Sequence, residues 1–218
     1  MYISKKREEK MEKRPMILSL LLAAAALYAS PAFAGDPAAD SLRPGVLLLY
    51  SSGEPLMTIS DIKGPEQLEG ITQPTPVEMN TRVAAGRIKE YLEKQGVAVV
   101  LKPVQEATDW REVMQYKTIV IGSATRFWNV TWETKRFFDD LFLRIYVREG
   151  KAKGKLFAIF TTTEIEPSGE RTLAAMESTI TDCGGNIGLR MILHRELSLE
   201  KARAEIDKFS TALAILAR

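Results

Sequence analysis

Five short apolar runs, each followed by a stretch of helix length, constrain the fold of this chain more than any other feature. They are rich in β-branched and aliphatic residues and too short for helices, which is typical of strands buried on both faces of a parallel sheet. The runs are Gly45–Tyr50, Val97–Leu101, Thr118–Ile121, Leu156–Thr161 and Ile187–Leu193. Such strict alternation predicts one domain in which crossover helices cover both faces of the sheet, a doubly wound three-layer α/β sandwich.

Capping residues mark where several of the helices should begin. Asn80 or Thr81 precedes an apolar pattern of helical spacing that stops at Gly96. Asp109 lies three residues before Glu112 in the spacing of a capping box, and Ser198 precedes the last helical pattern. We therefore expect helices directly after each of these positions.

The first 34 residues have the pattern of a secretory signal peptide. Basic residues concentrated in residues 5–14 precede an uncharged run rich in Leu and Ala at 15–28, and Ala32-Phe33-Ala34 supplies the small-x-small pattern of a cleavage site. The run is short for a membrane span; an uncleaved anchor and a buried helix are the alternative interpretations. We expect cleavage after Ala34 and export to the periplasm, with no stable membrane insertion afterwards.

Charge and cysteine content narrow the function classes. Removal of residues 1–34 takes away six of the 30 basic and three of the 28 acidic residues, which leaves 24 and 25. A nearly neutral mature chain lacks the basic footprint of a protein that binds nucleic acid or an anionic membrane. Cys183 and His194 are the only residues of their types, so neither an intramolecular disulfide nor a cysteine-and-histidine metal site can form.

The mature chain divides into a short tail and one domain with an unusual insertion. Residues 35–44 are rich in Asp, Ala and Pro and read as a tail, and the domain spans 45–218. Within it, residues 54–78 contain four prolines and no long periodic pattern, where a βαβ unit would place a helix. Loops of this length in a compact domain are usually lids, binding loops or disordered segments.

Polar loops follow three of the expected strands. They are Ser51-Ser52-Gly53, Gly122–Asn129 and Thr161–Glu170. Open α/β sheets bind ligands at the carboxyl ends of their strands, and in a sheet of order 2-1-3-4-5 the first and third strands flank the switch point. We therefore expect these loops to meet in one site. The alternative for the second loop is an ordinary connection with two packed aromatic side chains.

The second loop carries a family resemblance. Gly122-Ser123-Ala124-Thr125-Arg126-Phe127 followed by Asn129 resembles the G-[ST]-P-T-R-[FY]-G-N motif of flavodoxin-like NAD(P)H:quinone oxidoreductases related to the tryptophan-repressor-binding protein. Gly154-Lys155 through Thr163, with Gly169 and Thr172, resembles the same family's G-K strand and threonine-rich loop. The resemblance covers about residues 45–193 and implies a flavodoxin-like sandwich with a five-stranded parallel sheet of order 2-1-3-4-5.

The resemblance also implies FMN, bound noncovalently at the carboxyl edge of the sheet. The FMN phosphate would lie in the first loop, against backbone N–H groups at a helix N-terminus. Arg126 would stabilise negative charge on the reduced flavin or ligand. The implied cofactor contacts are Ser51, Ser52, Asn80, Thr81, Ser123, Thr125, Arg126, Phe127, Trp128, Asn129, Thr162 and Thr163.

Two departures from the family pattern leave alternatives open. The first loop is interrupted by residues 54–78, so either Asn80 and Thr81 still close on the phosphate or the phosphate site is lost. Trp128 replaces the family's glycine, which lets backbone approach the flavin. The Trp128 indole would stack on an aromatic ligand, fill the place of the flavin, or pack under the insertion.

Other residues give weaker evidence for a reactive site than the three polar loops do. Glu164 and Glu166 read as solvated loop charges rather than a hydrolase pair, and no G-x-S-x-G elbow is present. His194 reads as a surface or core histidine, and Cys183 as a small buried residue.

Two functions from different classes follow. The first is an exported FMN-binding electron-transfer protein, with FMN-dependent quinone or NAD(P)H-linked reduction as its expected activity. It would use a small-molecule electron acceptor or a partner redox protein, and it can form a homo-oligomer. The second is a flavin-free flavodoxin-like binding or interaction module, with a further option of a cleft for another aromatic or anionic ligand.

Overall fold

A computed structural model describes residues 43–52, 80–142, 152 and 154–217. The expected signal peptide and the 54–78 insertion lie outside the described residues, as does nearly all of the expected tail. The first strand begins at Arg43, two residues before the expected start of the domain. No helix in the described part of the chain is long and apolar enough to cross a membrane.

The core of the domain is one five-stranded parallel sheet of order β2-β1-β3-β4-β5. This order and the parallel pairing confirm the fold class expected from the sequence, a flavodoxin-like three-layer sandwich. The strands are β1 (Arg43–Ser51), β2 (Val99–Pro103), β3 (Tyr116–Ala124), β4 (Leu156–Thr163) and β5 (Asn186–His194).

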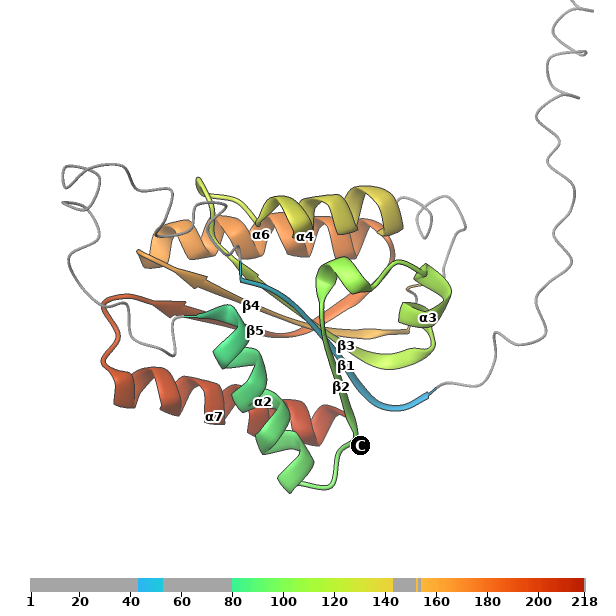
Figure 1. Cartoon of the computed structure of the whole chain (residues 1–218), viewed down its shortest axis with the longest axis horizontal. Helices are drawn as coiled ribbons and strands as arrows, with labels where there is room; N and C mark the ends of the chain where they lie inside the picture. Colours follow the sequence, from blue (N-terminus) through green and yellow to red (C-terminus); the bar gives the residue numbers. More distant parts are fainter. Residues whose placement is uncertain (1–42, 53–79, 143–151, 153, 218) are drawn as a thin grey trace, which may run out of the picture. The chain divides into compact units, whose positions relative to one another are not determined.

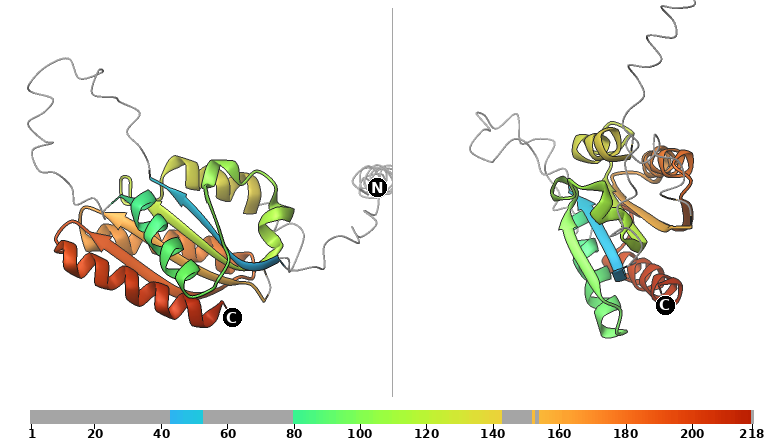
Figure 2. Two further views of the ribbon diagram at one scale, coloured as in Figure 1. Left: turned by 60° about the horizontal axis from the view of Figure 1, so that its bottom comes forward. Right: turned by 90° about the vertical axis from the view of Figure 1, so that its right-hand side faces the viewer.

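Helices cover both faces of this sheet. One face carries α2 (Thr81–Lys94) and α7 (Leu199–Leu216), and the other carries α3 (Trp110–Met114), α4 (Trp132–Phe137) and α6 (Glu166–Asp182). The 3-10 turn η5 (Val104–Glu106) follows β2, and the π-helix η6 (Phe138–Phe142) continues α4. Figure 1 shows α4 and α6 on the opposite side of the sheet from α2 and α7, and the views in Figure 2 agree.

Alternating side chains of the central strands feed two separate apolar cores. In β1, Leu47 and Leu49 face the α4 and α6 side, whereas Val46 and Leu48 face the α2 and α7 side. All four side chains have no exposed surface. A strand buried on both faces must be apolar throughout, which explains the continuous apolar runs of the sequence.

The expected helix starts are confirmed by their caps. The side chains of Asn80 and Asp109 accept hydrogen bonds from the backbone N–H groups of Arg82 and Arg111, both at 2.9 Å. Ser198 Oγ accepts from the Lys201 N–H at 3.3 Å. Each cap satisfies a backbone donor that has no partner within its own helix.

The strands around the expected site are longer than the sequence suggested. β3 continues through Ala124, and β4 through Thr163, because Ser123 pairs with Thr161 and Ala124 with Thr162. The expected polar loop after β4 is correspondingly short, since α6 begins at Glu166. Pro167 is tolerated in the first turn, where its missing N–H would have no helical partner.

Candidate functional site

The ends of β1, β3 and β4 lie side by side at the carboxyl edge of the sheet. Ser51 is in register with Ser123, and Ser123 with Thr161. The chain order reverses between β1 and β3, which makes this the switch point of the sheet. The structure therefore brings together the strand ends from which the three polar loops were expected to form a site.

Hydroxyl side chains on the α4 and α6 side of this edge hydrogen-bond to one another. Thr161 Oγ1 donates to the Ser123 carbonyl at 2.7 Å, and Thr125 Oγ1 donates to Thr172 Oγ1 at 2.9 Å. Ser123 and Thr161 have no exposed surface. Thr163 Oγ1 likewise hydrogen-bonds to Ser168 Oγ in the first turn of α6. These side chains stabilise the edge itself, because their hydroxyl groups already have hydrogen-bond partners within the protein.

Ser51 at the end of β1 is joined to α4. Thr131 Oγ1 donates to Ser51 Oγ at 2.7 Å, and Ser51 Oγ donates to Glu133 Oε2 at 3.2 Å. Thr131 is also the N-cap of α4, and its backbone N–H donates to Ser123 Oγ at 3.1 Å. One buried threonine thus fixes the start of α4 against two strand ends. Ser52 is the last described residue before the gap at 53–79.

The N-terminus of α2 lies at the same edge, on the opposite face. Thr81 Oγ1 and Thr162 Oγ1 are 2.6 Å apart and buried. Asn80 is exposed, and the first turn of α2 contains no acidic residue and one basic residue, Arg82. A helix N-terminus with this charge pattern favours an anion, because its free N–H groups and dipole are positive.

The loop after β3 is a tight hairpin made by Arg126, Phe127, Trp128 and Asn129. The Arg126 N–H donates to the Asn129 carbonyl at 2.8 Å, and the Asn129 N–H returns a bond to the Arg126 carbonyl at 3.0 Å. Both central residues have positive φ, 48° at Phe127 and 64° at Trp128. Two-residue turns of this kind normally use Asn and Gly, and the left-handed conformation costs other residues about 1 to 2 kcal/mol each.

The strained turn holds two aromatic rings out from the protein. Phe127 is 100% exposed and Trp128 is 46% exposed. The guanidinium carbon of Arg171, on α6, lies 5.6 Å from the centroid of the Trp128 ring, within the range of a cation–π contact. Backbone strain persists only where its surroundings enforce it, and such positions cluster at ligand sites. The alternative in which Trp128 packs under the insertion concerns residues outside the described ones.

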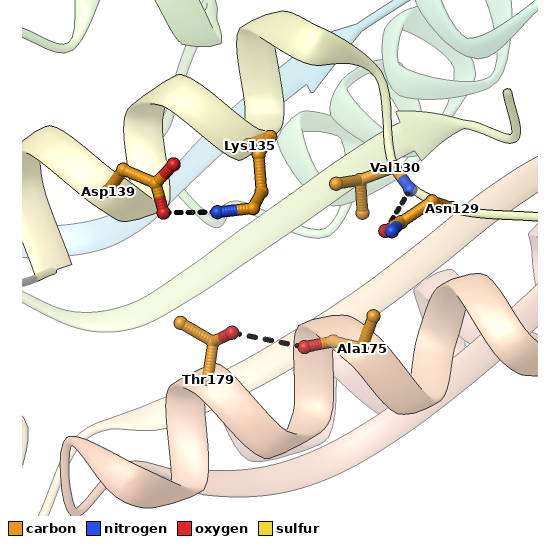
Figure 3. A network of polar contacts seen from close by, with 6 residues as sticks. All are labelled: Asn129, Val130, Lys135, Asp139, Ala175 and Thr179. Carbon is orange, nitrogen blue, oxygen red and sulfur yellow. Dashed lines mark hydrogen bonds and ion pairs between the residues drawn. The ribbon is translucent and has the colours of Figure 1, made fainter.

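Asn129 fixes the exit of the hairpin towards α4. Its side-chain oxygen accepts a hydrogen bond from the Val130 N–H at 2.8 Å. Figure 3 shows Asn129 and Val130 across from Ala175 and Thr179 of α6, with the ion pair between Lys135 of α4 and Asp139 of η6 nearby. The small cavity between them has a volume of about 160 Å³, below the range of about 300 to 1,000 Å³ that is usual for ligand pockets. This cavity is therefore too small for a ligand of flavin size.

The predicted site residues fall into two groups. The buried or half-buried group supports the edge through internal hydrogen bonds and comprises Ser51, Thr81, Ser123, Thr125, Thr162 and Thr163. The exposed group comprises Asn80, Arg126, Phe127, Trp128 and Asn129, and Ser52 is half-buried. Sequence reasoning did not identify Thr131, Glu133 or Arg171 as part of the edge. Their only sequence signal was proximity to the motif, or in the case of Arg171 to the next strand end.

The remaining candidate groups give no second reactive site. Within the described residues, no group of three or more His, Cys, Asp or Glu side chains could hold a metal ion. Glu164 is ion-paired with Arg195 at 3.2 Å. Burial, together with the charge of Asp182, raises the pKa of the Cys183 thiol, which disfavours the reactive thiolate.

Comparison with known proteins identifies the fold. No protein-family model matches the chain. Oxidised flavodoxin 2 from Bacillus cereus is 22% identical with a TM-score of 0.55, covering 79% of this chain and 99% of its own. The two-electron reduced flavodoxin of Megasphaera elsdenii is 19% identical with a TM-score of 0.53, covering 78% of this chain and 98% of its own.

A flavodoxin, WrbA-like protein from Agrobacterium tumefaciens is also similar. It is 16% identical with a TM-score of 0.52, and the match covers 81% of this chain and 100% of that protein. These identities are low, so the similarity establishes a shared flavodoxin-like fold and leaves the function to be argued from the site.

Proposed function

We propose that this chain is an exported FMN-binding flavodoxin-like protein that transfers electrons to or from a quinone, another small acceptor, or a partner redox protein. The observation that carries the proposal is the strained hairpin at the switch point of the sheet. Phe127 and Trp128 are held there with positive φ and exposed rings, beside the ends of β1 and β4. An exposed aromatic surface in a costly conformation favours a planar aromatic ligand.

The residues at the edge fit both ends of FMN. The isoalloxazine ring suits the exposed faces of Phe127 and Trp128, while the phosphate suits the N-terminus of α2 at Asn80 and Thr81. The Thr81–Thr162 contact fixes that N-terminus against the strand ends. The continuation of the first loop, residues 53–79, lies outside the described residues, so the phosphate assignment rests on α2 alone.

Bound FMN would supply the redox chemistry, and the protein would supply orientation and electrostatics. The rings of the hairpin would exclude water from one side of the flavin. Arg126 is exposed at the base of the hairpin. It would place positive charge near the flavin and stabilise the reduced, negatively charged flavin. In this proposal no side chain of the edge acts as a proton donor.

Export would determine the electron donor. We propose that residues 1–34 direct the chain to the periplasm and are removed after Ala34. NAD(P)H is a cytoplasmic reductant, so an exported protein would take electrons from a membrane carrier or a partner protein instead. This makes NAD(P)H-linked reduction the less favoured form of the activity.

The alternative is a flavin-free binding module, and one contact favours it. Ser51, the first hydroxyl of the expected phosphate loop, donates to the Glu133 carboxylate. A carboxylate beside a phosphate loop repels the phosphate group. If that repulsion prevails, the same exposed hairpin would bind a partner protein rather than FMN.

An absorption spectrum of the protein purified from the exported fraction separates the two functions. The proposal expects the visible bands of oxidised flavin, or an increase in melting temperature when FMN is added. Absence of copurified flavin together with no thermal effect of FMN would support the binding module. Mass spectrometry of the same sample tests export, because cleavage after Ala34 leaves Gly35 as the first residue.

A further inference from the structure

A second cavity, with a volume of about 410 Å³, lies between η5 and α4. We name it the Trp132 cavity. Its lining includes Val104, Ala107, Trp132, Glu133, Phe137 and Asp140. None of the hairpin residues lines it, and neither does Asn80 or Thr81. It borders the proposed flavin site through the hydrogen bond between Glu133 and Ser51. Its volume falls within the range of about 300 to 1,000 Å³ that is usual for small-molecule sites.

The lining of the Trp132 cavity combines buried apolar side chains with an exposed indole. Val104, Ala107 and Phe137 belong to the core and are at most 5% exposed. Trp132, the first residue of α4, is 56% exposed although it is a large apolar side chain. An apolar lining together with an exposed aromatic ring favours the binding of an aryl or alkyl group.

One of the two carboxylates around this apolar surface has a partner of opposite charge, and the other has none among the described residues. Asp140 is neutralised by Arg136, whose Nε lies 3.2 Å from Asp140 Oδ2. Glu133 has no Lys or Arg partner within 4 Å among the described residues, and its Oε2 accepts only the Ser51 hydroxyl at 3.2 Å. The cavity thus contains one half-buried carboxylate without a countercharge among the described residues, and the Trp132 indole lines the same cavity.

We propose that the Trp132 cavity binds a small organic cation, a primary ammonium carried on an aryl or alkyl body. The apolar body would cover Val104, Ala107 and Phe137, and the ammonium would lie between the Glu133 carboxylate and the Trp132 ring. A cation is attracted both by the carboxylate and by the negative face of the indole. The same groups disfavour an anion of equal size. The site does not depend on FMN.

Binding of three probes of similar size tests the charge preference directly. Isothermal titration of the full chain would use 2-phenylethylammonium, neutral 2-phenylethanol and anionic 3-phenylpropionate. The cation is expected to bind at least about tenfold more tightly than the alcohol, since an ion pair and a cation–π contact together contribute more than about 1.4 kcal/mol. The anion is expected to bind most weakly.

Variants locate the site. Glu133→Gln keeps the shape of the side chain and removes its charge, so it should weaken cation binding about tenfold and leave binding of the alcohol unchanged. Trp132→Ala should weaken both probes. Glu170→Gln, on α6 outside this cavity, is the matched control and should change nothing. Circular dichroism confirms that each variant is folded.

Indole N–H signals give a second readout, because the chain has three tryptophans. The cation should shift the Trp132 signal, assigned with Trp132→Phe, and leave those of Trp110 and Trp128 in place. Equal affinity for the three probes, no measurable binding, or cation affinity that Glu133→Gln leaves unchanged would overturn the proposal. Because the probes are added without flavin, these outcomes do not depend on whether FMN binds.

Discussion

Thr81 Oγ1 and Thr162 Oγ1 lie 2.6 Å apart, which joins the first turn of α2 to the carboxyl end of β4. The two residues are 81 positions apart in the chain, and both are nearly fully buried. The contact fixes the N-terminus of α2 at the edge where the β3 hairpin begins. It therefore couples the proposed phosphate site to the strand ends that support the proposed ring site.

Replacing either threonine by valine should destabilise the protein. Thr81→Val or Thr162→Val leaves one buried hydroxyl without its partner, which is expected to lower the free energy of unfolding by about 1 to 3 kcal/mol. The double variant should lose less than the sum of the two, because neither hydroxyl then remains. Urea denaturation of all four proteins measures this coupling. Strictly additive losses would show that the two hydroxyls do not interact.

Trp128 should lower the stability of the protein and increase its affinity for FMN. Trp128→Gly removes a side chain from the left-handed conformation, so the free energy of unfolding should rise by up to about 1 kcal/mol. FMN affinity should fall about three- to tenfold, because an aromatic stacking contact is lost. Thermal denaturation and flavin fluorescence measure the two effects.

Trp132→Ala provides the control for this experiment, since Trp132 lies outside the hairpin. Its FMN affinity should equal that of the wild type. Tighter FMN binding by Trp128→Gly would instead mean that the indole fills the place of the flavin.

Arg126→Ala should affect the flavin more than the fold. The side chain is exposed, and the backbone of this residue makes the two hydrogen bonds that close the hairpin, which the substitution keeps. Loss of the positive charge should make the flavin harder to reduce, which appears as a lower midpoint potential in a redox titration. Arg126→Lys should restore most of the potential. An unchanged potential in Arg126→Ala would exclude Arg126 from the flavin environment.

Lys155 should make stability depend on alkaline pH. Burial lowers the pKa of its ammonium below the ordinary value of 10.5. Between the lowered pKa and 10.5 the unfolded chain binds more protons than the folded chain, so the free energy of unfolding contributed by Lys155 rises with pH. Below the lowered pKa the cost of burying the charge is fully present.

Lys155→Met should therefore stabilise the protein at neutral pH and remove this alkaline rise. Urea denaturation across the alkaline range measures it. Lys201→Met, at an exposed position in α7, is the control and should keep the wild-type profile. A variant profile parallel to that of the wild type would show that Lys155 does not titrate differently in the folded state.

The sheet and its order were predictable because buried parallel strands leave continuous apolar runs. The caps at Asn80, Asp109 and Ser198 were predictable for a similar reason, since each is a local interaction with the next turn. The positions at which the strands end were less predictable from the sequence. Whether Thr163 belongs to β4 depends on its pairing with His194, a neighbour that the local sequence does not specify.

The hairpin was the least predictable part of the site. Phe127 and Trp128 carry no turn signal, because their conformation normally requires Asn or Gly. A tertiary contact, that of Arg171 with Trp128, helps to hold a turn that the local preferences of Phe127 and Trp128 oppose. The motif therefore did not predict the geometry of this loop, and its role in ligand binding stays a prediction.

A fluorescence titration of the full protein with FMN, with riboflavin as the comparison, tests the central proposal most directly. FMN should bind saturably at one molecule per chain. Riboflavin, which lacks the phosphate, should bind more weakly because it cannot use the N-terminus of α2. No saturable change with FMN would contradict flavin binding at this edge, and equal affinity for the two flavins would contradict the phosphate site at Asn80 and Thr81.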